Sequence, residues 1–335
     1  MTGAGQVTGA AAGNAAGAGA PVGPPVGGEG PDLARRATAD PLFRLVAYAL
    51  ESAHGRAPAA VWSAPHAFHL GSPGLVAAAG WPVAAAAAPR SDGLVRLSSL
   101  GHPADSCEVP LAPDGPPSAV PAWAARPYAL LRVLARAGYG RGGTDLHVQG
   151  SLTAASGLAV AEPADCATAL AVADVHGDAR GGAGGPAGGE PDRARLARLL
   201  AEALPGSDRA LHRAALFARP GEALLMDGDG GRPPRHVTFD PAASGSRLVL
   251  LAVRGSLPAA DRPAALARAV DCARRAGALS AWPPGPRPGR SVLVLLPGTR
   301  LTAVRAAVAE DFRGRGQPVP RFLNIAVAGA ARREE

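Results

Sequence analysis

The stretch between Gly150 and Leu170 holds the residues whose types and spacing could do chemistry. A strand that ends near Gly150 leads into a loop of small residues around Gly157, and a helix begins shortly afterwards. Proteins often hold a nucleotide phosphate in this way, because glycine backbones allow close approach and the N–H groups at a helix start face the anion. The sequence therefore predicts a loop of the phosphate-binding type. Ser156 is its one central hydroxyl, and none follows the loop.

The first turn of the following helix carries Glu162 and Pro163. Proline lacks an N–H donor, and Glu162 places a negative charge where a phosphate group would lie. A carboxylate at a helix start stabilises the helix by roughly 0.3–1 kcal/mol, so we expect the helix to persist with its anion site occupied by its own side chain. Two alternatives stay open: a weak nucleotide site, or a purely structural turn.

Composition narrows the class of protein. The chain has 335 residues, which favours two domains. All 34 basic residues are arginine and the net charge is +7, but the arginines are dispersed without interleaved aromatic residues, so we expect no nucleic-acid partner. The three cysteines are far apart and fit neither a disulfide framework nor a zinc site, which predicts a cytoplasmic protein.

No membrane partner or secretory leader is expected. The N-terminus has neither a basic region nor an apolar region of the kind that a signal peptide carries. The apolar stretch at residues 75–89 contains Pro82 and is shorter than the roughly 20 residues that a bilayer span requires.

Helical and strand-like segments alternate without a strict β-α-β rhythm, which favours an α+β fold. The periodicity of apolar residues predicts helices at residues 41–53, 123–137, 164–175, 193–204, 263–276 and 302–312, and strands at residues 60–63, 81–86, 94–98, 145–150, 222–226, 247–253, 291–296 and 322–327. The expected domain order is a disordered Gly/Ala/Pro tail (residues 1–31), a first domain (40–176), a low-complexity linker (177–191) and a second domain (192–330).

From about residue 42 to 333 the chain resembles the galactokinases of actinobacteria, which are GHMP small-molecule kinases. The similar stretches lie in the family's order and spacing, at residues 61–65, 92–100, 137–146, 221–227, 276–279 and 303–312. The resemblance implies a two-domain GHMP-kinase-like fold, with an S5-domain-2-like N-terminal sandwich and a reduced ferredoxin-like C-terminal domain. It also implies ATP and Mg²⁺ as cofactors and phosphorylation of galactose at O1.

The resemblance places vestigial sites at a few positions. The vestigial ATP and magnesium loop comprises Ala155, Ser156, Gly157, Leu158 and Asp165, and the vestigial sugar site comprises Gly71 and Ser72.

Residues that carry the family's chemistry are replaced. Ala67 stands at the Arg of the first motif, Leu75 or Val76 at the sugar-holding Asp, and Leu211 at the catalytic Asp. Further replacements affect the loop serines, which become Ala159, Val160 and Ala161, and the third glycine-rich loop, which becomes the proline-rich segment 283–290. No catalytic residue is therefore assigned.

Other polar residues near these positions leave alternatives open. Asp208 or His212 could act as a displaced catalytic base; the alternative interpretation is that this segment is a plain surface helix. His66 and His69 could be read as metal ligands, but structural or exposed histidines are the favoured interpretation.

These departures predict a galactokinase-like protein without efficient phosphoryl transfer, a pseudokinase that serves as a scaffold or binds a small molecule such as a sugar or nucleotide. The alternatives are an active ATP-dependent sugar 1-kinase with a remodelled site, and a merely foldable product of a gene under no selection.

Overall fold

The computed structural model describes residues 33–36, 38–72, 74–115, 117–177, 190–226, 234–285 and 289–335. The tail expected at residues 1–31, most of the linker expected at 177–191, and Arg287 of the proline-rich segment lie outside the described residues.

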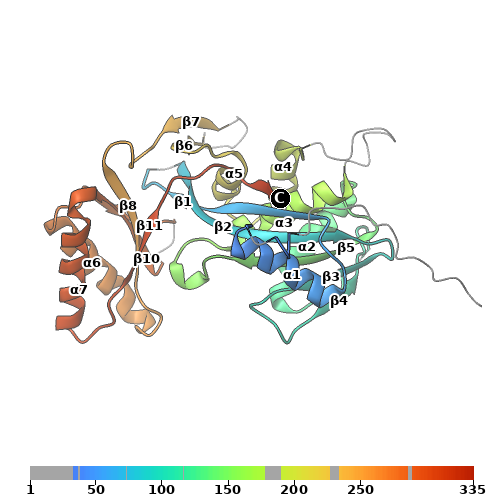
Figure 1. Ribbon diagram of the computed structural model, residues 1–335, viewed down its shortest axis with the longest axis horizontal. Coiled ribbons are helices and arrows are strands. Elements are labelled where there is room, and N and C mark those ends of the chain that lie inside the picture. Colours follow the sequence, from blue (N-terminus) through green and yellow to red (C-terminus); the bar gives the residue numbers. More distant parts are fainter. Residues whose placement is uncertain are drawn as a thin grey trace, which may run out of the picture. The chain divides into compact units, whose positions relative to one another are not determined.

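The larger sheet contains eight strands (Figure 1). Six of them follow the order β12-β1-β2-β5-β3-β4. The strand β6 pairs with the N-terminal end of β2, at Leu75 and Val76, and with β7. Among the strands of this sheet that the structure describes, β3 and β5 are the one parallel pair. The strands are β1 (Ala60–His69), β2 (Leu75–Pro89), β3 (Leu94–Ser98), β4 (Cys107–Pro110), β5 (Gly143–Gly150), β6 (Glu222–Leu225), β7 (Arg235–Thr238) and β12 (Arg332–Glu334).

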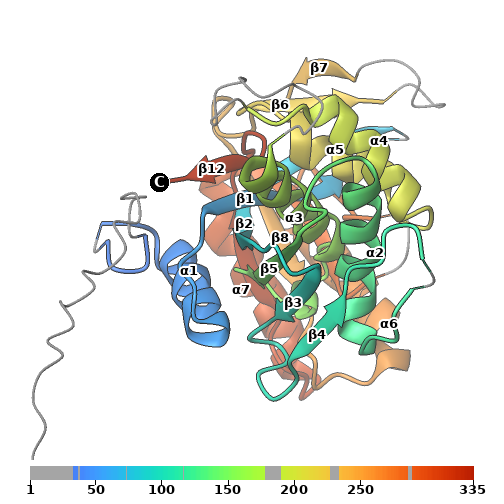
Figure 2. The same ribbon diagram turned by 90° about the vertical axis from the view of Figure 1, so that its right-hand side faces the viewer.

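Helices cover both faces of this sheet, which explains why the centre of β2 is a run of buried small residues. Ala85 and Ala87 face a core shared with α2 (Ala122–Arg136), α3 (Ala161–His176), α4 (Arg193–Ala203) and α5 (Arg209–Phe217). The alternate residues, Ala84, Ala86 and Ala88, face α1 (Pro41–His54) on the other side. Figure 2 shows α1 and the group of α2 and α3 on opposite sides of the strands.

The smaller sheet has the order β11-β8-β10-β9, and its strands are all antiparallel. It consists of β8 (Ser246–Ala252), β9 (Ser280–Trp282), β10 (Ser291–Pro297) and β11 (Arg321–Ile325), with α6 (Arg262–Arg275) and α7 (Leu301–Gly314) between them in the chain. This β-α-β-β-α-β order is ferredoxin-like. The α+β fold with a two-domain arrangement, expected from the sequence, is confirmed.

The two sheets share an apolar core. Phe68 and Ala77 of the larger sheet pack in one cluster with Leu250 and Leu293 of the smaller sheet. The opposite face of the smaller sheet is covered by α6 and α7, through Val249, Leu251, Val304 and Phe312 among others. The strand β8 is therefore buried on both faces, with Val249 and Leu251 in one cluster and Leu248 and Leu250 in the other.

Residues 193–226 and 234–238 belong with the larger sheet, on the other side of the boundary that the sequence suggested. Leu196 and Leu200 of α4 and Leu216 of α5 belong to the core of the larger sheet, and β6 pairs with β2. The low-complexity segment misled the assignment, because a composition change marks a long connection but does not tell which core the chain enters next.

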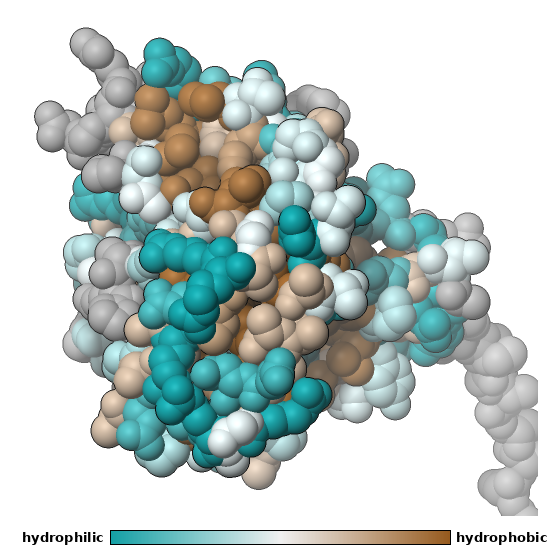
Figure 3. All heavy atoms as spheres, turned by 90° about the vertical axis from the view of Figure 1, so that its left-hand side faces the viewer, coloured by the Kyte–Doolittle hydropathy of each residue, from teal (hydrophilic) through white to brown (hydrophobic). Residues whose placement is uncertain are grey.

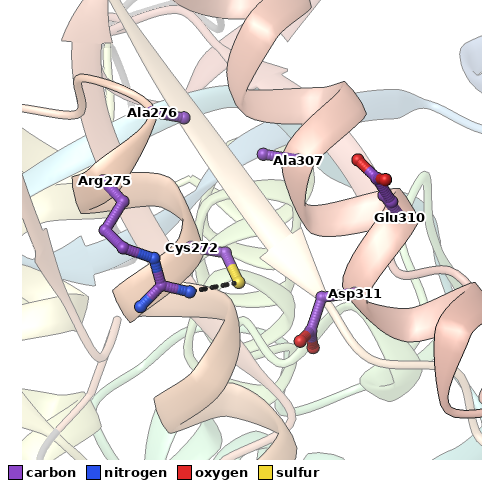
Figure 4. A pocket seen from close by; sticks show the side chains of 6 residues that line it. All are labelled: Cys272, Arg275, Ala276, Ala307, Glu310 and Asp311. Carbon is purple, nitrogen blue, oxygen red and sulfur yellow. Dashed lines mark hydrogen bonds between the residues drawn. The ribbon is translucent and has the colours of Figure 1, made fainter.

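The end of the molecule where α6 and α7 lie carries hydrophilic side chains over much of its surface (Figure 3). Between these helices is a hollow of about 390 Å³, where Arg275 donates a hydrogen bond of 3.2 Å to the buried Sγ of Cys272 (Figure 4). All three cysteines, Cys107, Cys166 and Cys272, are free and buried. Within the described ranges, no helix has the length and apolar character needed to cross a membrane.

Candidate functional site

A cavity of about 730 Å³ lies where the loop after β5, the start of α5 and the connection between β9 and β10 meet. It is the candidate site because the loop predicted to bind phosphate forms one of its walls. The lining residues are Ala154, Gly157, Leu158, Ala159, Glu162, residues 206–211, Pro284, Gly285, Gly289 and Arg290.

The N–H groups of the loop are used within the loop. Residues Ala154–Ser156 form a 3₁₀ turn, in which the N–H of Ser156 donates to Thr153 at 2.9 Å and that of Gly157 to Ala154 at 3.1 Å. The N–H of Leu158 donates to Oγ of Ser156 at 3.3 Å, so the loop's central hydroxyl is also engaged. A phosphate loop works through free N–H groups, and these three donors are not free.

Gly157 is required here because β10 approaches the loop closely. Its φ is 80°, and a Cβ atom at this position would lie 2.2 Å from Oγ of Ser291. Ser291 begins β10 and is buried, and its Oγ has no hydrogen-bond partner among the described residues. The space above this glycine is thus filled by the protein's own serine.

Asp165, the residue that the resemblance places as a cofactor ligand, is buried and fully engaged. Nε of Arg126 lies 3.0 Å from Oδ1, and Nη2 of Arg126 lies 2.6 Å from Oδ2. Nε2 of His212 lies 2.9 Å from the same Oδ2. The carboxylate therefore has a two-pronged guanidinium contact and an imidazole contact, and it does not line the cavity.

The Arg126 guanidinium also serves Glu162, whose Oε1 lies 3.7 Å from Nη2. The same Oε1 accepts a hydrogen bond of 3.4 Å from the backbone N–H of Asp208. Mg²⁺ needs oxygen ligands in near-octahedral order, and here the two carboxylates share an arginine instead. No group of three or more potential metal-binding side chains occurs among the residues that the structure describes. The residues present do not fit a magnesium site.

A buried apolar cluster stands beside the cavity. It comprises Ala67, Val76, Leu211, Ala214 and Leu224, with the half-buried Ala159, Ala210, Phe217 and Met226 packed against it. The fold thus brings together positions that the resemblance gives separately: Ala67 at the first-motif Arg, Leu211 at the catalytic Asp, and Val76, one of the two candidates (Leu75 or Val76) for the sugar-holding Asp. All three are apolar and together make a small core.

The residues around Leu211 do not form a plain surface helix. Five residues of α5 are buried, among them Leu211 and His212. His212 contacts Asp165 on the far side of the helix, so it does not line the cavity. Of the two displaced bases considered from the sequence, only Asp208 does.

Asp208 caps α5 and pairs with His69. Its Oδ1 accepts from the N–H groups of Ala210 at 3.0 Å and Leu211 at 3.3 Å, and its Oδ2 lies 2.8 Å from Nε2 of His69. Burial raises the pKa of Asp208, but the hydrogen bonds from His69 and the backbone outweigh this and hold the pKa below its ordinary value. Asp208 is therefore an ionised carboxylate beside an imidazole at the cavity.

His69 connects three segments. Its backbone N–H donates to Pro284 at 2.8 Å, and its carbonyl accepts a hydrogen bond of 2.9 Å from the indole of Trp282. The two histidines of the first motif do not act together, because Nδ1 of the buried His66 lies 2.8 Å from the carbonyl of Ala159. Burial lowers the pKa of His66. The structural interpretation of these histidines therefore holds better than the metal interpretation.

The other predicted site residues are dispersed. Gly157 and Leu158 line the cavity, whereas Ala155 is exposed and Ser156 is buried under the loop. Gly71 and Ser72 form the exposed turn between β1 and β2 and do not line the cavity. The His69–Asp208 pair was not predicted as a unit, although an Asp before a helix is a recognisable capping signal.

Comparison with known protein sequences finds a similar galactokinase. The chain is 29% identical over 211 residues to a galactokinase of Streptomyces coelicolor, and the match spans 60% of this chain and 52% of the relative. The chain thus matches about half the length of this curated relative. No family model matches the chain.

Comparison of folds covers more of the chain. The crystal structure of Lactococcus lactis galactokinase complexed with galactose superposes with a TM-score of 0.67 at 14% identity, over 86% of this chain and 99% of that one. Mevalonate kinase from Methanococcus jannaschii has a TM-score of 0.56 at 11% identity, over 80% and 98%. A homoserine kinase from Cytophaga hutchinsonii has a TM-score of 0.53 at 14% identity, over 82% and 97%. The galactokinase-like character and the GHMP-kinase fold expected from the sequence are confirmed.

Proposed function

We propose that this protein is a galactokinase-like protein that binds a sugar-sized molecule in the cavity beside α5 but does not transfer a phosphoryl group to it. The observation that carries the proposal is the apolar cluster of Ala67, Val76 and Leu211. Phosphoryl transfer depends on charge stabilisation and on a group that positions or deprotonates the nucleophile. An alanine, a valine and a leucine supply neither.

The nucleotide side of the cavity supports the same conclusion. The N–H groups of Ser156, Gly157 and Leu158 are used internally, and Glu162 puts a carboxylate on the wall where a triphosphate would lie. Asp165 is engaged by Arg126 and His212. ATP and Mg²⁺ therefore lack the donors and ligands that they need.

A sugar fits the cavity better than a nucleotide does. The cavity volume of about 730 Å³ is in the range of small-molecule sites, and its wall carries both acceptors and donors, including Asp208, Ser207 and Arg290. Sugar hydroxyl groups can donate to the carboxylate and accept from the arginine at once. Galactose is the first sugar to test, because the protein resembles galactokinase.

Two measurements on the purified full-length protein test the proposal. In a coupled assay of ADP release with ATP, Mg²⁺ and galactose, we expect no turnover above that of a protein-free control. In a thermal-shift series, we expect galactose or a related hexose to raise the melting temperature and ATP with Mg²⁺ to leave it unchanged. A ligand that is present at 100 times its Kd raises the free energy of unfolding by about 2.7 kcal/mol, so binding would be detectable. Sustained ADP release that depends on galactose would refute the proposal.

A second candidate function is an active sugar kinase with a remodelled site. The His69–Asp208 pair favours it, because an ionised carboxylate next to an imidazole can take a proton from a ligand hydroxyl. The variant Asp208→Asn separates the two candidates, since Asn retains the helix cap but cannot accept the proton. Activity present in the wild type and lost in this variant would establish the second candidate in place of the first.

A further inference from the structure

A second cavity, of about 600 Å³, lies on the opposite face of the larger sheet from α3. It opens between α1, the ends of β3 and β4, and β5. None of its lining residues also lines the cavity beside α5. Its polar floor is formed by His54, Ser98 and His147, each from a different element.

These three residues form a hydrogen-bonded relay. Oγ of Ser98 lies 3.0 Å from Nε2 of His54 and 2.9 Å from Nδ1 of His147. His54 also makes a hydrogen bond with the backbone of Leu146, one that favours the protonated ring. Nε2 of His147 is buried and has no hydrogen-bond partner within the described part of the chain.

The proton positions in the relay follow from these contacts. A backbone group that favours a protonated imidazole is a carbonyl, so His54 donates through Nδ1, and its Nε2 is a bare acceptor. Ser98 must then donate its hydroxyl proton to His54. The remaining contact is satisfied only if Nδ1 of His147 donates to Ser98 Oγ. In a neutral imidazole, Nε2 of His147 is consequently an unprotonated acceptor.

Both imidazoles are neutral near pH 7. Burial, together with the neighbouring His54, lowers the pKa of His147 to about 4. Burial is also the main reason that the pKa of His54 is lowered, although Asp145 opposes it. An unmatched acceptor in a buried place costs free energy that a hydrogen-bond donor would recover.

The rim of this cavity is apolar. Leu45, Tyr48 and Leu100 line it, and they are three of the five large hydrophobic side chains that are exposed among the described residues. The polar side chains beside these residues face one another: Nε of Arg96 lies 2.5 Å from Oε2 of Glu108, and Nδ1 of His102 lies 3.9 Å from Oδ2 of Asp105. The cavity thus offers apolar contact and a neutral acceptor, without an unpaired charge on the residues named.

We propose that this cavity is a second binding site, for a small, uncharged and largely apolar molecule that carries a hydroxyl or N–H donor, of which a phenol is the simplest type. The donor bonds to Nε2 of His147, and the ring packs against Tyr48 and Leu100. The site is independent of the cavity beside α5 and of the function proposed for it.

Isothermal titration calorimetry with two matched probes tests the proposal. The probes are 2-naphthol, which has a donor, and 2-methoxynaphthalene, which has the same ring without one. We expect the wild-type protein to bind 2-naphthol saturably, with an affinity about tenfold higher than that for the ether. The absence of saturable binding, or equal affinity for the two probes, would overturn the proposal.

Two variants locate the bound probe. His147→Asn keeps a donor at the position of Nδ1, so the contact with Ser98 is preserved, but it lacks the acceptor at Nε2. We expect this variant to lose the preference for the hydroxyl probe. Tyr48→Ala should weaken both probes by about threefold to tenfold, while Leu279→Ala should change neither. Tyr48 and Leu279 are both 62% exposed, and Leu279 is absent from the lining of this cavity.

Each variant can contradict the site independently. Retention of the hydroxyl preference in folded His147→Asn would place the bound hydroxyl elsewhere. If that variant does not fold, the comparison of Tyr48→Ala with Leu279→Ala decides, and equal effects of these two substitutions would overturn the site.

Discussion

Ala67 of β1 and Leu211 of α5 lie in one buried hydrophobic cluster, and their exposed fractions are only 1% and 3%. The resemblance to galactokinases places these two positions at the family's first-motif Arg and catalytic Asp. In the present protein they pack in the same apolar cluster as Val76 and Leu224. The replacements are mutually consistent, because each apolar side chain is buried by the others. Both positions therefore belong to the core.

Restoring a carboxylate in this cluster should therefore destabilise the protein. Leu211→Asp removes a buried leucine and places a charge where the cluster offers only apolar side chains. We expect the free energy of unfolding to fall by at least about 4 kcal/mol, measured by urea denaturation. Leu279→Asp, at an exposed position, is the matched control and should cost less than about 0.5 kcal/mol. Equal losses for the two variants would contradict the burial of this cluster.

The Arg126 guanidinium contacts Glu162 and also Asp165, the residue that the resemblance places in the magnesium loop. Arg126→Gln should lower the free energy of unfolding by about 3 kcal/mol, because it removes the guanidinium from a buried carboxylate that then keeps the contact with the imidazole of His212. It should also create a response to magnesium: Mg²⁺ should raise the melting temperature of the variant but not that of the wild type.

Arg136→Gln is the control for this experiment. Arg136 lies on the same helix and pairs with Glu202 at 3.2 Å, but both side chains are exposed. A surface pair contributes about 0–1 kcal/mol, so this variant should be nearly as stable as the wild type and indifferent to Mg²⁺. A melting temperature of the wild type that rises with Mg²⁺ would show that Arg126 does not replace the ion.

The sequence predicted those elements that local signals determine. The helix expected at residues 41–53 is α1, and Oδ1 of Asp40 caps it by accepting a hydrogen bond of 2.8 Å from Leu42. The strand expected at residues 81–86 proved much longer, since β2 runs from Leu75 to Pro89. Alanine has little strand propensity of its own, and β2 is held by its pairing with β1 and β5. The strands β4, β7, β9 and β12 have only three or four residues each and were not predicted.

The candidate site was predictable only in part, for a related reason. The loop around Gly157 has a local pattern that could be recognised in the sequence, and it lines the cavity. The contacts that decide its chemistry join distant elements: Arg126 on α2 reaches Asp165 on α3, and His69 on β1 reaches Asp208 before α5. A single sequence contains no periodicity that relates such pairs. The apolar cluster was hidden in the same way, because its members are ordinary core residues one by one.

Substitution at the loop glycine tests how closely β10 covers the loop. Gly157→Ala forces an alanine to a φ of 80° and brings its Cβ within 2.2 Å of Ser291 Oγ. The backbone conformation alone costs about 1–2 kcal/mol, and we expect a total loss of about 3 kcal/mol with the collision included. In the double variant Gly157→Ala/Ser291→Gly, about half of that loss should be recovered. Additive effects of the two substitutions in a double-mutant cycle would mean that Ser291 does not cover the loop.

The histidine relay under α1 should make stability depend on pH. Burial, assisted by the neighbouring His54, lowers the pKa of His147 from an ordinary value of 6.5 to about 4 in the folded protein. Between these two values the unfolded chain binds a proton that the folded protein does not. The free energy of unfolding should therefore fall as the pH decreases from about 6.5 to about 4, by about 3 kcal/mol from this residue, and the loss is complete below pH 4.

His54, His66 and His176 also have a lowered pKa because of burial, so they act in the same direction. The contribution of His147 is isolated by comparing the wild type with His147→Asn in urea denaturation at pH 7, 5.5 and 4. Near His147 and His54 lie Asp145, which favours a protonated His54, and Arg96, which opposes it; both remain in the variant. The variant should lose less stability than the wild type over this range, since Asn does not titrate. Parallel pH profiles for the two proteins would show that the fold does not hold His147 neutral. The proton assignment on which the second binding site depends would then be wrong.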